Sequence, residues 1–140
     1  MEDPGGEQLA PAEVSGGRQS EEEYRLLVEN CPVCIHQIDL SGRLMSMNRA
    51  GLTMLGLADE SEIVGLLYLD SVAERDQARI RELLEAATQG AASAFEFRSV
   101  NGREFQSSFV PIRDRAGRVL RLMGMTQDIT ERKQAEERAW

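Results

Sequence analysis

The sequence predicts an α+β fold in which an antiparallel sheet carries helices on one side. The first observation is the order of elements along the chain: two strand candidates, then helical stretches, then three strand candidates. The second is that short turn signals separate the strands within each group, so that neighbours in sequence can pair directly. An arrangement of this kind favours an antiparallel sheet with its helices gathered on one face.

The composition is that of one globular domain. The chain has 140 residues, of which 41% are hydrophobic and 29% charged. No apolar run approaches the ~20 residues that a membrane span requires. The first residues have neither the basic start nor the apolar stretch of a secretory signal. We therefore expect a cytoplasmic protein with no membrane segment in this chain.

Acidic residues are concentrated at the N-terminus. Residues 1–23 hold seven acidic side chains against a single basic one, in a chain of net charge -8. Residues 1–19 are expected to form a disordered acidic leader, because so little apolar surface cannot offset the entropy of ordering it. The folded domain is expected over residues 20–130, and residues 131–140 should begin a linker or coiled-coil helix. The scattered basic residues do not indicate nucleic-acid binding.

The first ordered element is expected to be a short amphipathic helix. Ser20 can act as its N-cap, with Glu23 three residues later as the partner in a capping box. Apolar residues then follow at helical spacing. Pro32 should end this helix, because the residue before a proline is disfavoured in the α region.

A hairpin and a second helix should follow. Strand candidates over residues 33–40 and 44–47 flank a Ser-Gly dipeptide at 41–42, which predicts a β-hairpin. Asn48 can cap a helix that ends at Gly56, a residue suited to the left-handed C-terminal position.

The longest helix is expected over residues 73–89, where apolar residues recur at helical spacing and Gly90 ends the pattern. The last three strand candidates are residues 94–100, 104–112 and 119–128.

Residues 21–137 resemble a Per-Arnt-Sim (PAS) sensor domain. The family's opening helix and first hairpin are similar to EEEYRLLVENCPVCIHQIDLSGRLMSMNRAG, and its middle helices to EIVGLLYLDSVAERDQARIRELL. Its central strands are similar to VNGREFQSSFVPIRDRAGRV, and its closing strand and signal-transmitting helix to GMTQDITERKQAEERA. The resemblance implies a five-stranded antiparallel sheet with helices on one face, an N-terminal capping helix and a C-terminal signalling helix.

The resemblance also implies a function. PAS domains of this type stand before histidine kinases and cyclases, so the chain is expected to detect a small-molecule or redox cue and relay it to an effector. That effector would be a histidine kinase, a cyclase or a transcription regulator outside this chain. The alternative is a ligand-free PAS scaffold for dimerisation or protein interaction. An enzyme is not expected, because one histidine cannot supply a catalytic constellation and no Gly-rich phosphate loop is present.

The stretch CPVCIH places both cysteines and the only histidine, Cys31, Cys34 and His36, within six residues. A CxxC pair is half of a usual zinc site, and only one histidine is left to supplement it. A thioredoxin-like pair begins at a helix N-terminus, whereas here the first cysteine follows a predicted helix end. We therefore expect no metal at this motif, and two small, partly buried thiols.

His36 is expected on an inward strand face. The period of a strand puts Cys34, His36 and Ile38 on one side. By similarity to the family, that side looks toward the ligand cavity, with Phe95 and Gly124 at further inward positions. The implied pocket is lined by His36, Ile38, Phe97, Phe105, Ser107, Phe109, Leu122 and Thr126. Two interpretations stay open: His36 contacts a ligand, or it belongs to a packed core and has a backbone or hydroxyl partner.

No cofactor can be named from the sequence. In flavin-binding members of the family a cysteine follows the glycine of the EIVG-like motif by three residues, and here that position is Tyr68. Heme-binding members take a histidine from the long helix, and residues 73–89 contain none. A flavin adduct and helix-ligated heme are therefore not expected. Methionines at strand spacing are more often packing residues than soft-metal ligands; they are Met45, Met47, Met54, Met123 and Met125.

Two further expectations concern partners. Met123 and Met125 should face outward from the sheet, where the N-terminal helix or a second copy could cover them, so a homodimer is expected. Packing within one chain is the alternative. Asp128 and Thr130 are expected to carry the signal output, with Asp128 as the cap of the last helix and Glu131 as its capping-box partner.

Overall fold

One antiparallel sheet forms the centre of the domain, as predicted. The computed structural model describes residues 9–139, with side chains described from residue 19 onward. The strand order is β2-β1-β5-β4-β3, and every neighbouring pair is antiparallel. The strands are β1 (Cys34–Ile38), β2 (Leu44–Met47), β3 (Ser93–Arg98), β4 (Glu104–Arg113) and β5 (Val119–Asp128).

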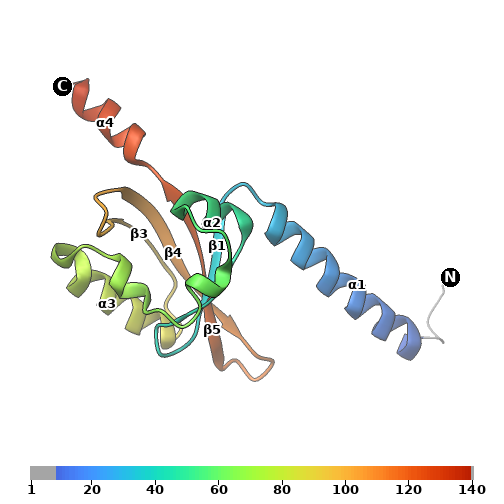
Figure 1. Cartoon of the computed structure of the whole chain (residues 1–140). Coiled ribbons are helices and arrows are strands. Elements are labelled where there is room, and N and C mark those ends of the chain that lie inside the picture. The colour runs from blue at the N-terminus through green and yellow to red at the C-terminus, as the bar shows by residue number, and fades with distance from the viewer. Residues whose placement is uncertain (1–8, 140) are drawn as a thin grey trace.

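The helices between β2 and β3 cover one face of this sheet, whereas the two terminal helices extend away from it (Figure 1). The covering helices include α2, α3 and two short 3-10 helices. The bounds are α1 (Leu9–Asn30), α2 (Arg49–Leu55), η1 (Glu60–Glu62), η2 (Tyr68–Ser71), α3 (Glu74–Thr88) and α4 (Thr130–Arg138). Among the described residues, no helix is both long and apolar enough to cross a membrane.

Helix α1 begins earlier than predicted. It starts at Leu9, so Ser20 lies inside the helix and does not cap it, and residues 9–19 are helical where we expected disorder. Pro11 is compatible with this start, because the N–H groups of a first helical turn have no partner within the helix. The rest of the predicted leader, residues 1–8, lies outside the described residues. The C-terminal end at Asn30, before Pro32, agrees with the prediction.

Asn48 joins three elements around the start of α2. Its side-chain oxygen accepts hydrogen bonds from the backbone N–H of Gly51 (3.1 Å), which caps α2 as predicted, and of Ile35 (2.9 Å) on β1. Its side-chain amide donates to the carbonyl oxygens of Val28 (2.6 Å) on α1 and Val33 (3.0 Å). Asn48 and its bond to Gly51 are buried, whereas the other three bonds are partly buried.

The core lies between the sheet and α3. The buried side of α3 consists of Ile80, Leu84 and Ala87. Aromatic rings fill the facing side of β3 and β4, and the rings of Phe95 and Phe109 have centroids 4.7 Å apart. Burying a large apolar side chain contributes roughly 1.5–3 kcal/mol. This core therefore holds the inward face of the sheet in place.

Candidate functional site

The inward face of β1 is the starting point of the site. Cys34, His36 and Ile38 are all buried there, as the strand period predicts, and His36 is only 2% exposed. Strand β1 lies between β2 and β5, so His36 is enclosed by strands on both sides. Its register partners are Met47 on β2 and Gly124 on β5.

Four polar side chains meet on this face. The Tyr68 hydroxyl donates to Ser107 Oγ (3.1 Å), and Ser107 Oγ shares a hydrogen bond with Thr126 Oγ1 (2.8 Å). The His36 ring stacks on the Tyr68 ring with centroids 5.5 Å apart. These residues come from η2, β4, β5 and β1, so the cluster exists only in the folded chain.

A small cavity adjoins the cluster. Its volume is about 60 Å³. It is lined by Cys34, His36, Leu44, Met47, Met54, Leu55, Tyr68, Ser71, Phe97, Phe105 and Thr126. A water molecule in the liquid occupies roughly 30 Å³, and pockets for organic ligands usually measure roughly 300–1,000 Å³. In this conformation the cavity can accept an ion or two waters, and it is too small for an organic ligand.

Burial keeps the titratable groups of the cluster uncharged at neutral pH. It lowers the pKa of His36 to about 4 and raises the pKa of the Cys34 thiol to about 12. Burial also raises the pKa of the Tyr68 hydroxyl. The His36 ring is therefore a neutral imidazole, with its Nδ1 atom 3.8 Å from Cys34 Sγ.

The other ring nitrogen, His36 Nε2, is buried and has no hydrogen-bond partner. It lies against Gly124, where an added Cβ would be 2.7 Å from Nε2 and would also collide with the Ser108 carbonyl oxygen. Only glycine at position 124 lets the imidazole lie this close to β5. The packed-core interpretation expects a hydrogen bond from His36 to a backbone or hydroxyl group. Nε2 makes no such bond.

The eight predicted pocket residues divide into two groups. His36, Phe97, Phe105 and Thr126 line the cavity. The others are buried in the surrounding core without lining it: Ile38, Ser107, Phe109 and Leu122. Ligand contact by any of the eight stays a prediction.

Sequence reasoning missed Tyr68 as a member of the site. The tyrosine is 5% exposed, it stacks on His36, and it lines the cavity. A signal was present, because Tyr68 occupies the position that the PAS resemblance assigns to an adduct-forming cysteine. That position should have been expected to face the cavity. For Met47 and Met54 the sequence favours packing over a soft-metal site, and both line the cavity.

We expect the substitution Cys31→Ser to change the free energy of unfolding by no more than about 0.5 kcal/mol, because Cys31 lies at the edge of the core and is only half-buried. The purified protein should also contain no stoichiometric zinc or iron, since no group of three His, Cys, Asp or Glu side chains among the described residues could hold either metal. Urea denaturation and metal analysis test both statements. One equivalent of zinc or iron that is lost with Cys31→Ser would contradict them.

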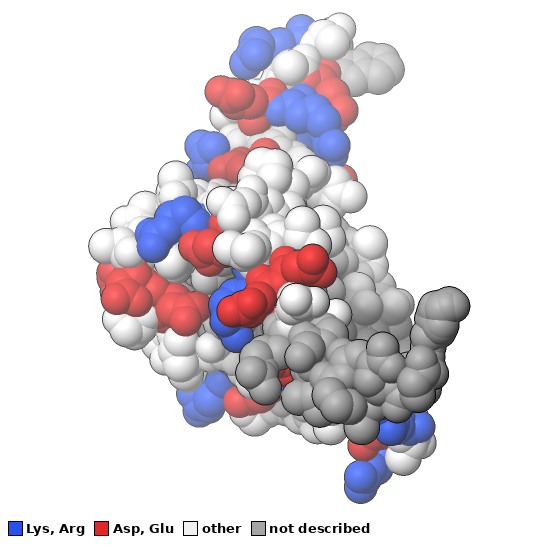
Figure 2. All heavy atoms as spheres, turned by 90° about the vertical axis from the view of Figure 1, so that its right-hand side faces the viewer, with Lys and Arg blue, Asp and Glu red and all other residues white. Residues whose placement is uncertain are grey.

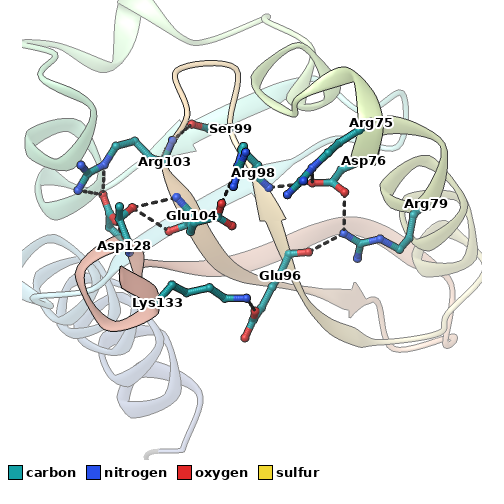
Figure 3. A network of polar contacts seen from close by, with 11 residues as sticks. Arg75, Asp76, Arg79, Glu96, Arg98, Ser99, Arg103, Glu104, Asp128 and Lys133 are labelled. Atoms are coloured by element: carbon teal, nitrogen blue, oxygen red, sulfur yellow. Dashed lines mark hydrogen bonds and ion pairs between the residues drawn. The ribbon is translucent and has the colours of Figure 1, made fainter. Parts of the chain in front are cut away.

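A second candidate site lies where β5 meets α4 (Figure 3). Asp128 Oδ1 accepts hydrogen bonds from the backbone N–H (3.0 Å) and the hydroxyl (2.6 Å) of Thr130. Asp128 Oδ2 pairs with Arg103 (2.8 Å), and Thr130 Oγ1 accepts from the backbone N–H of Glu104 (2.9 Å). Burial alone would raise the pKa of Asp128, but the hydrogen bonds from Thr130 and Arg103 outweigh it and lower the pKa.

The predicted capping box at this junction is not formed. Ile129 is the N-cap residue of α4 and makes no side-chain cap hydrogen bond. Asp128 lies one position before the cap, where its carboxylate holds Thr130 and Arg103, and no bond from Glu131 to Asp128 is made. The junction is thus tied to β4 by side chains, which is a firmer attachment than the single cap we expected.

Ion pairs extend this attachment along one side of the domain (Figure 3). Glu96 on β3 pairs with Lys133 (2.8 Å) and Arg132 (3.3 Å) on α4. Each such exposed pair contributes little, between about 0 and 1 kcal/mol.

On the face shown in Figure 2, acidic and basic side chains are interspersed, also along α4, and they do not form a patch of one sign.

Known proteins were compared with this chain at three levels: a family model, a curated relative and solved structures. A family model described as the PAS fold matches residues 28–134. The C4-dicarboxylate transport sensor protein DctS of Rhodobacter capsulatus is 33% identical over 118 residues, which cover 79% of this chain. The chain spans only 18% of the length of that relative.

Solved structures share the fold at low identity. The PAS domain of a protein from Colwellia psychrerythraea superposes with a TM-score of 0.69 at 21% identity, covering 79% of this chain and 97% of the other. The N-terminal domain of a diguanylate cyclase with PAS/PAC sensor from Marinobacter aquaeolei has a TM-score of 0.61 at 15% identity, covering 72% and 98%.

Proposed function

The chain belongs to the PAS fold family, and from this premise we propose that it is a non-catalytic signal-transduction sensor module. It detects a small-molecule or redox cue in its core and relays the change through α4 to an effector, which is a histidine kinase, a cyclase or a transcription regulator. A cytoplasmic location is supported by two cysteines that are both free thiols, as expected in a reducing compartment.

The observation that carries this proposal is the short distance along β5 between the two candidate sites. Thr126 belongs to the buried polar cluster, and Asp128, two residues later, holds the start of α4. Asp128 is also the register partner of Phe105, which lines the cavity. A shift of β5 at Thr126 therefore moves the groups that fix α4. A change in population needs only a few kcal/mol of difference between two states.

The test is a fusion of residues 1–140 to a histidine kinase core. The substitutions Asp128→Ala and Thr130→Ala, made singly, should each alter the basal kinase activity by several-fold, because each removes a side chain that holds α4 on β4. The matched control is Asp114→Ala, which breaks a similar carboxylate–arginine pair (Asp114 with Arg118, 3.2 Å) in the hairpin between β4 and β5. If both junction variants behave like the control while the domain remains folded, the proposed route is wrong.

The alternative function is a ligand-free scaffold for dimerisation. Two exposed leucines of α1 support it, because Leu26 is 62% and Leu27 is 72% exposed while Tyr24 on the same helix contacts Met123 on the outer sheet face (3.3 Å). Met125 on that outer face is also exposed. A second copy would cover this apolar surface, so the homodimer is part of both proposals. The scaffold is favoured if Leu27→Glu abolishes the activity of the fusion while core and junction variants leave it unchanged.

A further inference from the structure

Soft donor atoms gather in the small cavity beside His36. The chain has two cysteines, one histidine and six methionines. One cysteine, the histidine and two methionines line this single cavity: Cys34, His36, Met47 and Met54. Thiol, thioether and imidazole groups are the ligands that suit soft transition metals. Four of the eleven residues that line the cavity thus carry soft donor atoms.

The backbone brings three of these donors to one point. Cys34 and His36 are two residues apart on the inward face of β1, with Sγ and Nδ1 separated by 3.8 Å. Met47, at the end of β2, is the register partner of His36. A Cβ added to Gly51 would lie 2.6 Å from Cys34 Sγ and 2.8 Å from Met47 Sδ, so both sulfur atoms pack against the same glycine. The two sulfur atoms are therefore near each other, and Cys34 Sγ is also near the imidazole.

Size and charge select the occupant. A cavity of about 60 Å³ admits an ion without rearrangement. Burying an isolated charge is costly, but one thiolate neutralises one positive charge, so a monovalent cation leaves the buried site neutral overall. Thioether and thiolate ligands favour Cu(I). Structural zinc takes four Cys, His or carboxylate ligands, and the lining of this cavity offers only two such residues, Cys34 and His36.

We propose that this cavity is a Cu(I) site, with Cys34 Sγ, His36 Nδ1 and Met47 Sδ as ligands and Met54 as a nearby thioether, and that its occupancy is the cue that the domain senses. The sensing role rests on the function proposed above, whereas the binding itself does not.

The binding step balances without an oxidant or reductant. The Cys34 thiol releases its proton to solvent, a copper–sulfur bond forms, and Cu(I) keeps its oxidation state. The imidazole binds through the lone pair of its unprotonated Nδ1 atom. One proton leaves for each Cu(I) bound. The affinity should therefore rise as the pH is raised.

The experiment is an anaerobic titration of the whole chain with Cu(I) against bicinchoninate, a chelator that absorbs only when it holds Cu(I). We expect one equivalent to bind. Cys34→Ser should weaken binding at least about 100-fold, and Met47→Leu about tenfold or more, since even loss of a residue that only supports a ligand costs about 10–100-fold. The matched controls, Cys31→Ser and Met45→Leu, change a half-buried thiol and an exposed thioether outside the cavity and should leave the affinity unchanged.

Circular dichroism of each variant shows whether it folds. If Cys34→Ser does not fold, Met47→Leu still tests the site, because leucine has nearly the volume of methionine and should not disturb the core. Absence of binding would overturn the site. Equal weakening by Cys31→Ser would also overturn it, because the bound Cu(I) would then be an adventitious ion only. The fusion to a kinase core separates the two proposals. If Cu(I) binds but the kinase output does not change, the sensing role of Cu(I) is wrong. If the protein has no affinity for Cu(I) but the junction variants still alter the output, the function proposed above stands and only the Cu(I) site is wrong.

Discussion

Replacing Asn48 by alanine is expected to lower the free energy of unfolding by roughly 3 kcal/mol. The substitution removes the cap of α2, which costs about 1 kcal/mol. It also leaves partly buried backbone groups without partners, at up to about 1–3 kcal/mol for a fully buried group. The affected groups are the N–H of Ile35 and the carbonyl oxygens of Val28 and Val33. Urea denaturation followed by circular dichroism measures the change.

A matched asparagine is available as the control. Asn30 is exposed and makes one side-chain hydrogen bond, to the carbonyl oxygen of Leu26 (2.8 Å). The substitution Asn30→Ala should change stability by no more than about 0.5 kcal/mol. Asn48→Asp keeps the acceptor oxygen for Ile35 and Gly51 but places a carboxylate oxygen against the carbonyl oxygens of Val28 and Val33, so it should be at least as destabilising as Asn48→Ala. If Asn48→Ala is as mild as Asn30→Ala, Asn48 does not hold α1, β1 and α2 together.

The stability of the protein should fall as the pH is lowered from 6.5 toward 4, because His36 must stay neutral in the folded state. Its folded pKa is lowered to about 4 from an ordinary value of 6.5. Between these values the unfolded chain binds a proton that the folded chain does not, so unfolding becomes more favourable with each step toward acid. The accumulated loss at pH 4 is roughly 3 kcal/mol.

The substitution His36→Phe isolates this effect, because His36 is the only histidine of the chain. Phenylalanine retains a ring against Tyr68 and titrates nothing. Carboxyl groups with lowered pKa values, such as those of Asp39, Asp76 and Asp128, lose their stabilising effect only as the pH falls below their ordinary values near 4. Chemical denaturation at pH 6.5, 5.5 and 5 should therefore show a slope in the natural sequence that His36→Phe abolishes. Parallel profiles for both proteins would refute the assignment.

Local signals predicted most of the fold. The helix from Asn48 to Gly56 was predicted with both ends, because its cap and its terminator act within a few residues of it. The N-terminal helix failed at its start, because the Ser20–Glu23 pattern is also compatible with the interior of a longer helix. A capping box contributes only about 1 kcal/mol, and a signal this weak does not decide where a helix begins.

The candidate site was predicted only where one strand determines it. The period of β1 placed Cys34, His36 and Ile38 on the buried face. Tyr68 and Met47 reach the same cavity from η2 and β2, and no periodicity within one element indicates that they meet. The junction at Asp128 shows the same limit, because the hydroxyl of Thr130 binds Glu104, which lies 26 positions earlier in the chain. Capping rules based on neighbouring residues cannot include such a contact.

Because β1 and β5 are neighbours in the sheet, the chain enters and leaves the domain at adjacent positions. Cys34, just after α1, pairs with Thr126, just before α4. The Cα atoms of such partners lie about 4.5–5.5 Å apart, little more than the 3.8 Å between consecutive residues. Everything between them returns the chain almost to the point from which it left. A gene segment with this geometry can be inserted between two helices, or deleted from between them, while their spacing is nearly conserved, so the domain is well suited to spread as a cassette by recombination.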